Sequence, residues 1–167
     1  MDPPASFDHI AARYQGGIRT YLVRLLGHEQ DAEDVCQNAF LRAHRAFARL
    51  APNSNTRAWL YKIATNSALS ALKSRRRRTT GLCDLDLDTL PADAAAPPER
   101  REQLRAVDGA VRALPPKQRA ALMQRQFQGL SYAEIGAILG CSEASARANV
   151  YQAIKKLRAA LDRPQAR

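Results

Sequence analysis

Hydrophobic residues recur at steps of three and four along most of the chain, which is the spacing that places side chains on one face of an α-helix. Three such runs fill the first half: one ends at Gly27, one ends before Pro52, and one spans about residues 56–75. Nothing in this half alternates with period two for long enough to suggest a strand. The pattern therefore predicts one small bundle of three helices.

The second half carries four more helical runs. The first has an apolar stripe and stops at the pair Pro115-Pro116, and the second is closed by Gly129. The stripe residues of these two runs are Leu104, Val107, Val111 and Leu114, then Leu122, Met123 and Phe127.

The last two runs have the clearest local signals. Ser131 and Glu134 have the spacing of a capping box, in which each side chain satisfies a free backbone N–H at a helix start. Gly140 permits a left-handed turn, and Ser142 can cap the longer helix that follows. These signals predict a helix-turn-helix, a unit that also occurs in many proteins that bind no nucleic acid.

The charge of the chain is divided by position. The 167 residues include 26 Lys and Arg against 16 Asp and Glu, a formal charge of +10. Residues 1–78 carry +7, residues 79–98 carry −4, and residues 99–167 carry +7. Two basic ends suit a polyanion contacted at two places, although ordinary solubilising charge would give the same balance.

The acidic middle segment contains Pro91, Pro97 and Pro98 and no sustained helical period. We expect it to be mostly extended and flexible. The predicted fold is therefore all-α, with two small helical domains joined by a flexible acidic linker and a helix-turn-helix in the C-terminal domain.

The sequence lacks the features of a membrane protein, a disulfide-rich or metal-binding protein, and an enzyme. Arg or Lys interrupts each apolar window, and no basic stretch followed by an apolar one opens the chain, so we expect a cytoplasmic protein without membrane insertion. Cys36, Cys83 and Cys141 are far apart and lack ligand spacing, so no disulfide framework, metal site or other cofactor is expected. No nucleophile with its base is evident either, and we expect no enzyme activity.

The first domain has an uneven charge distribution. Four acids and no lysine or arginine lie at the predicted start of the second helix: Glu29, Asp31, Glu33 and Asp34. Acids there also stabilise the helix dipole, which is the plainer explanation. The third helix instead has seven bases and no acid, together with Trp59, Tyr61 and Asn66. Aromatic rings among bases suit an unpaired nucleic-acid strand, although Trp59 is by type more often a core residue.

Four segments, in this order, resemble the bacterial extracytoplasmic-function (ECF) sigma factors of RNA polymerase. They are DAEDVCQNAF at residues 31–40, TRAWLYKIATN at 56–66, LPPKQR at 114–119 and LSYAEIGAILG at 130–140. The resemblance covers about residues 7–161. Any one segment is weak evidence, but the four together have the order and spacing of the family.

The resemblance implies an alternative sigma factor that directs promoter-specific transcription initiation. Residues 1–78 would form sigma region 2, which binds core polymerase and recognises and melts the -10 element. Residues 79–98 would be the linker, and residues 99–167 would form sigma region 4, which recognises the -35 element. The implied partners are core RNA polymerase, through its β′ coiled coil and β subunit, promoter DNA, and an anti-sigma factor.

The resemblance also assigns residues to each surface. The polymerase-binding set is Asp31, Glu33, Asp34, Gln37, Asn38 and Leu41. The -10 set is Asn53, Ser54, Asn55, Arg57, Trp59, Lys62, Asn66 and Lys73. The -35 set is Glu143, Ala144, Arg147, Ala148, Asn149, Tyr151, Gln152 and Lys155.

Two assigned residues have a specific implied chemistry. Asn66 matches the asparagine beside a flipped base, whose free pairing edge suits an amide, although Asn66 could instead bond backbone within its helix. Arg147 keeps the long basic donor suited to guanine. Asn149 and Gln152 stand where the family often has arginine, so the phosphate contacts or the -35 preference would differ.

Two alternative functions are distinguishable. A helix-turn-helix repressor would explain the second domain but leaves the acidic helix and the Trp59 to Asn66 segment without a role. A small nuclease would need clustered carboxylates and a metal, which the sequence does not offer.

Overall fold

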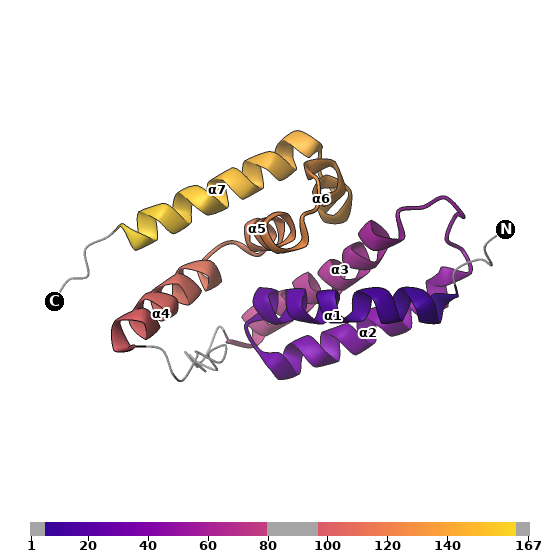
Figure 1. Cartoon of the computed structure of the whole chain (residues 1–167), viewed down its shortest axis with the longest axis horizontal. Coiled ribbons are helices and arrows are strands. Elements are labelled where there is room, and N and C mark those ends of the chain that lie inside the picture. Colours follow the sequence, from indigo (N-terminus) through magenta and orange to yellow (C-terminus); the bar gives the residue numbers. More distant parts are fainter. Residues whose placement is uncertain (1–5, 80–96, 163–167) are drawn as a thin grey trace.

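The structure, a computed structural model, describes residues 6–79 and 97–162 of the chain. Each regular element in these two stretches is an α-helix, as predicted. The first lobe contains α1 (Phe7–Leu26), α2 (Glu29–Phe47) and α3 (Thr56–Thr79). The second lobe contains α4 (Pro98–Arg112), α5 (Pro116–Gln128), α6 (Tyr132–Leu139) and α7 (Glu143–Leu161) (Figure 1).

The helices of the first lobe begin and end within about one turn of the residues predicted for them. Helix α3 continues past residue 75 through the arginine run to Thr79, and α4 begins at Pro98. Both ends of the predicted linker are therefore helical, and the remainder, residues 80–96, lies outside the described residues.

The local signals around the helix-turn-helix are confirmed. Ser131 Oγ accepts from the Glu134 N–H at 3.1 Å, and the Glu134 carboxylate accepts from the Ser131 N–H at 2.8 Å. Ser142 Oγ caps α7 by accepting from the Ser145 N–H. Gly140 has φ 68°, a left-handed conformation that ends α6 without the strain a side chain would add.

Three stripe residues of the second lobe lie on its surface instead of in its core. Leu104, Val107 and Phe127 are 46%, 40% and 53% exposed. Helix α4 has no fully buried residue, and among the described residues it packs mainly on α7, while Leu114, just after it, is buried. Helical spacing identifies one face of a helix but does not specify how far a neighbouring helix covers that face.

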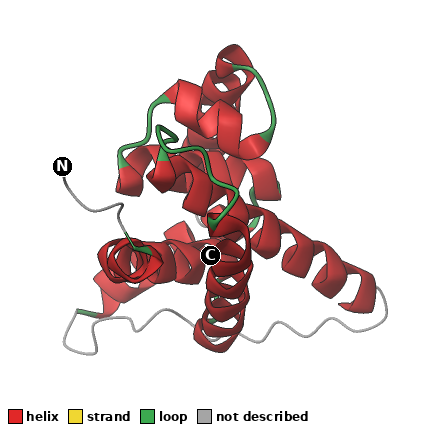
Figure 2. Ribbon diagram, turned by 90° about the vertical axis from the view of Figure 1, so that its right-hand side faces the viewer, coloured by secondary structure: helices red, strands yellow, loops and turns green. Residues whose placement is uncertain are grey.

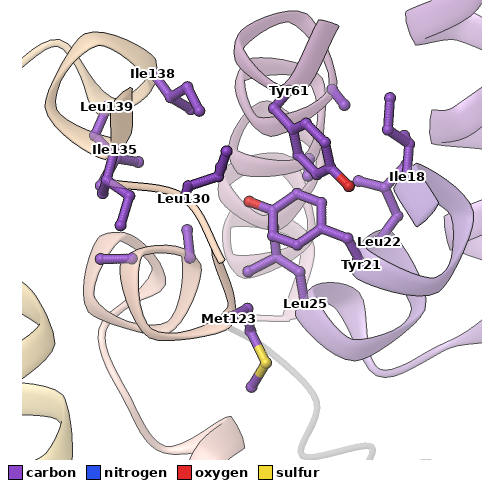
Figure 3. Close-up of a cluster of buried hydrophobic side chains, with 14 of the residues drawn as sticks. Ile18, Tyr21, Leu22, Leu25, Tyr61, Met123, Leu130, Ile135, Ile138 and Leu139 are labelled. Atoms are coloured by element: carbon purple, nitrogen blue, oxygen red, sulfur yellow. The ribbon is translucent and has the colours of Figure 1, made fainter. Parts of the chain in front are cut away.

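The two lobes share one hydrophobic core. Helix α1 packs on α5 and α3 packs on α6, so the lobes lie against each other (Figures 1 and 2). Tyr21 and Leu25 of α1 lie close to Met123 and Leu130 of the second lobe (Figure 3). The sequence predicted two small domains but not this direct contact between them.

Gly136 permits the close approach of α6 to the turn before α7. A Cβ at this position would lie 2.7 Å from the carbonyl oxygen of Cys141 and 3.2 Å from backbone atoms of Ser142. Gly136→Ala is therefore expected to destabilise the protein by about 1 to 3 kcal/mol, because backbone would have to move. The measurement is the shift of the urea unfolding midpoint.

Gly109→Ala in α4 is the matched control, because a Cβ there would meet no atom within 4 Å. It should be neutral or stabilise by up to about 1 kcal/mol, since alanine is the better helix former. Equal destabilisation by both substitutions would contradict the steric explanation.

Candidate functional site

One side of α2 carries solvent-exposed side chains. Asp34, Gln37, Asn38 and Leu41 are all exposed, at the spacing that places them along one side of the helix. Leu41 is 57% exposed, which is unusual for a leucine at the middle of a helix face. An acid, two amides and one apolar side chain form a surface suited to a basic, amphipathic partner helix. We call these four residues the α2 face.

The other two predicted polymerase-binding residues, Asp31 and Glu33, are partly engaged within the first lobe, as is the nearby acid Glu29. Glu33 accepts from Arg19 Nε at 2.9 Å, and Glu29 accepts from the same guanidinium at 2.7 Å. Asp31 lies 3.4 Å from Arg75 Nη1 of α3. These acids therefore tie α2 to α1 and α3, and Asp34 is the acid that stands within the α2 face.

A second surface follows the exposed side of α3. Lys62, Asn66 and Lys73 are exposed, while the neighbouring Leu60, Ala64 and Ala68 are in the core. Trp59, at the start of the same side, is half-buried against Phe47, with ring centroids 6.5 Å apart. Asn66 takes part in none of the side-chain hydrogen bonds found among the described residues, so its amide is available to a ligand.

The loop before α3 contacts the second lobe. Asn55 Oδ1 caps α3 by accepting from the Ala58 N–H at 3.0 Å, and its Nδ2 donates to Glu134 at 2.9 Å. Arg57 donates to the carbonyl oxygen of Gln128. Backbone donation from Ser131 and these contacts hold the pKa of Glu134 below its usual value, so its carboxylate stays ionised. Asn53 is exposed and Ser54 is half-buried in the same loop.

A buried polar cluster joins the lobes beneath this loop. Tyr21 of α1 and Thr65 of α3 share a hydrogen bond of 2.9 Å between their hydroxyls. Gln124 of α5 donates from Nε2 to both, at 2.9 and 3.1 Å. All three side chains are fully buried, and Gln124 Oε1 has no hydrogen-bond partner among the described residues. We call these three residues the interlobe cluster.

Two tyrosines near this interface are neutral, and burial moves their pKa values still further above physiological pH. Burial raises the pKa of Tyr21 to about 12, and it raises the pKa of Tyr61 to about 12 as well. The Tyr61 hydroxyl donates to Gln128 Oε1. The contacts between the lobes depend on neutral hydroxyls and amides as well as on apolar packing.

Two arginines of the second lobe also bind the end of α1. Buried Arg119 donates from Nη1 to the carbonyl oxygen of Leu25 at 2.9 Å, and Arg112 donates to that of Gly27 at 3.3 Å. Cations are favourable at a helix C-terminus, where the backbone carbonyls lack partners within the helix. Arg119 also donates to the carbonyl oxygen of Leu114 in its own lobe, so its guanidinium is hydrogen-bonded to both lobes.

The third surface is the outer side of α7. Seven of its eight predicted DNA-contacting residues are exposed and Asn149 is half-buried, while Ala146, Val150 and Ala153 face the core. Arg147 lies 3.5 Å from Glu143 one turn earlier, and its guanidinium carbon is 4.8 Å from the ring centre of Tyr132. Helix α7 follows α6 after a tight turn, which is the arrangement of a helix-turn-helix. In DNA-binding proteins with this unit, the first residues of the second helix contact base edges in the major groove.

Other kinds of site are not found in the parts of the chain that the structure describes. Residues 6–79 and 97–162 contain no group of three or more His, Cys, Asp or Glu side chains placed to hold a metal. Nor does any helix in these ranges combine the length and apolar character needed to cross a membrane. Cys36 is buried and Cys141 half-buried, both as free thiols; Cys83 lies outside the described residues.

Comparison with known proteins decides the family. Residues 10–78 match Sigma-70 region 2, and residues 104–157 match Sigma-70, region 4. The chain is 33% identical to the RNA polymerase sigma-H factor of Pseudomonas aeruginosa, covering 93% of this chain and 86% of that protein. It is 31% identical to the ECF RNA polymerase sigma-E factor of Escherichia coli, covering 89% and 82%.

The chain belongs to the ECF RNA polymerase sigma factors. This sigma factor acts with core RNA polymerase and directs promoter-specific transcription initiation. Its fold is similar to that of the sigma factor RpoE in complex with the anti-sigma factor NepR from Bartonella quintana, with TM-score 0.77, 25% identity, and coverage of 94% of this chain and 98% of that one. It is also similar to CnrH in complex with the cytosolic domain of CnrY, with TM-score 0.69, 26% identity, and coverage of 93% and 87%.

Sequence reasoning about the sigma factor missed the interlobe cluster and the second-lobe partners of Asn55 and Arg57. One sequence signal for the contact was available in α5. Four consecutive residues, Ala120 to Met123, are apolar. The structure buries these four and the residue on each side of them, Arg119 and Gln124. A helix that is apolar around more than one side is usually covered on more than one side.

Proposed function

We propose that the sigma factor uses three separate surfaces for its three ligands. The α2 face binds the β′ coiled coil of core polymerase, with Asp31 and Glu33 at its edge. The exposed side of α3 and the loop before it contact the -10 element, and the outer side of α7 contacts the -35 element. The observation that carries this proposal is that each predicted set keeps an exposed polar face while the other side of the same helix lies in the core.

Within this proposal, residues 1–78 act as region 2 and residues 99–167 as region 4, with residues 79–98 linking them. The family matches over residues 10–78 and 104–157 support both assignments. The chain contributes specificity in the cytoplasm, and the chemistry of RNA synthesis belongs to the polymerase.

The two lobes must separate when the promoter is bound. The -35 and -10 elements lie about 25 base pairs apart, roughly 80 Å at about 3.4 Å per base pair. In the structure α6 packs on α3, and α7 packs on α6, so the two DNA-binding helices are about two helix spacings, or roughly 20 Å, apart. The arrangement described here is therefore a closed state, and contacts to both elements require an open one.

An anti-sigma factor is a fitting partner for the closed state. The sigma factor RpoE, to which this chain is similar over 94% of its length, was determined in complex with the anti-sigma factor NepR. We propose that a comparable protein binds this chain while its lobes are close together.

The test of -10 recognition uses Asn66→Ala. Losing an amide that holds a flipped base should weaken promoter opening by about 1 to 3 kcal/mol, while the closed promoter complex forms almost normally. The measurement is permanganate reactivity of promoter thymines with reconstituted holoenzyme, on a promoter selected by the wild-type holoenzyme.

A second template with a pre-melted -10 bubble separates base reading from melting. Pre-melting removes the unstacking cost but cannot replace a lost contact, so partial rescue is expected. If the substituted holoenzyme opens the ordinary template as well as wild type does, Asn66 does not hold a base.

A further inference from the structure

Tyr132 contacts two arginines of neighbouring helices. The guanidinium carbon of Arg147, from α7, lies 4.8 Å from the centre of the ring, and that of Arg125, from α5, lies 4.5 Å from it. Arg125 is itself fixed, because its Nη1 donates to the carbonyl oxygen of Leu130 at 3.0 Å. The half-buried ring thus connects α5, α6 and α7 through two cation–π contacts.

The Glu143 contact alone is too weak to orient Arg147. The two side chains are 58% and 64% exposed and 3.5 Å apart, and an exposed ion pair one turn apart on a helix adds little. A guanidinium paired with a carboxylate also directs some of its N–H groups toward that carboxylate. To read guanine, Arg147 needs those same N–H groups directed at the base edge.

The cation–π contact with Tyr132 has a different consequence. A guanidinium is planar, its faces are weakly hydrated, and its five N–H donors point outward in its plane. Contact with the ring at 4.8 Å limits where the guanidinium of Arg147 can lie, and it engages none of the N–H groups, of which only the Nη2 near Glu143 has a partner nearby among the described residues. The ring therefore lowers the conformational freedom that a long side chain would otherwise lose on binding.

We propose that Tyr132 is a positioning residue for -35 recognition, which orients Arg147 for a base pair that Tyr132 itself does not touch. The inference rests on the proposed role of Arg147. It adds a residue outside the recognition helix to those that determine sequence preference. The aromatic ring, and not the phenolic hydroxyl, performs this role.

The experiment measures base preference with reconstituted holoenzyme on a library randomised in the -35 element and fixed elsewhere. Arg147→Ala first identifies the base pair whose preference depends on that arginine. Tyr132→Leu is expected to lower the preference at this same base pair by about 2- to 12-fold, as judged from the ordering cost of one long side chain. Tyr132→Phe keeps the ring and should retain most of the preference.

Phe127→Leu is the matched control. It removes another cation–π pair, since the Arg24 guanidinium carbon lies 4.1 Å from the Phe127 ring centre, but this pair joins α5 to α1 and includes no residue of α6 or α7. Base preference should not change in this variant. The NMR shifts of the Arg147 side chain give a readout that needs no DNA: ring-current shifts should be present in wild type and Tyr132→Phe and lost in Tyr132→Leu.

The outcomes distinguish failure of the proposed role of Arg147 from failure of the proposed role of Tyr132. If Arg147→Ala leaves every base preference unchanged, the proposed role of Arg147 fails, whatever the NMR shifts show. If Arg147→Ala removes a preference that Tyr132→Leu retains, the positioning role of Tyr132 is wrong. A uniform loss of affinity in Tyr132→Phe, or in Tyr132→Leu together with a lower melting temperature, would also overturn it, because it would indicate a phosphate contact or a purely structural role.

Discussion

Gln124→Glu is expected to open the sigma factor at neutral pH. Glutamate has nearly the shape of glutamine, but its carboxylate would be fully buried between Tyr21 and Thr65 without a cation. An uncompensated buried charge costs about 3 to 5 kcal/mol, and separation of the lobes removes that cost by hydrating the carboxylate. Small-angle X-ray scattering should show a larger radius of gyration at pH 8 than wild type has.

The pH dependence of this effect has a definite sign. Burial in the closed state would raise the pKa of the introduced carboxyl above its value in the open state. The protonated form resembles glutamine, so the closed state is retained at low pH and is lost as the pH rises through the raised pKa. The variant should therefore be compact near pH 5 and expanded near pH 8.

Gln128→Glu is the control one turn further along α5. Its carboxylate would be half-buried, would accept from the Tyr61 hydroxyl, and would lie near Arg57, so closure should survive. Equal expansion of both variants would show that any acid in α5 separates the lobes. An unchanged radius for Gln124→Glu at pH 8 would show that the interlobe cluster does not hold the closed state.

Asp34→Lys is expected to weaken binding to core polymerase by roughly 100-fold, or about 3 kcal/mol. The change places a cation in the α2 face, where the proposed partner helix is basic, and like charges across an interface cost several kcal/mol. Folding should be almost unaffected, because the Asp34 side chain is exposed. The measurement is the dissociation constant of the full chain with core polymerase at moderate salt.

Glu102→Lys in α4 makes the same change of charge at an exposed position of the second lobe. It should leave polymerase binding within about twofold of wild type, since Glu102 lies outside the α2 face. The Asp34→Lys defect should also shrink at high salt, because screening weakens exposed charge pairs. Equal affinities for the two variants would place the polymerase contact elsewhere.

Much of the fold could be predicted because its determinants are local. Helical spacing, the Ser131 capping box, and the glycines that end α1, α5 and α6 act within a few residues of where they stand. The family resemblance then assigned candidate contact residues to α2, α7, and α3 with the loop before it, and most of these residues are exposed.

The closed state could not be predicted in the same way. The interlobe cluster joins three side chains that are far apart in the chain, and the apolar run in α5 indicates that this helix is covered but not which residues of the first lobe cover it. The surface positions of Leu104 and Phe127 have the same origin, because burial depends on which helix covers a face. Contacts between lobes thus escape reasoning that treats each lobe by itself.

The hydrogen bond between Tyr21 and Thr65 bears on how the chain is synthesised. Gln124 is 59 residues further along than Thr65, the later of the two hydroxyls, and at about 5 to 20 residues per second the ribosome needs roughly 3 to 12 seconds to reach it. During that time the first lobe has emerged without its covering helix. Since the two hydroxyls lie in the same lobe and satisfy each other, a nascent first lobe can fold without an unpaired buried hydroxyl and await α5 with its contact surface already formed.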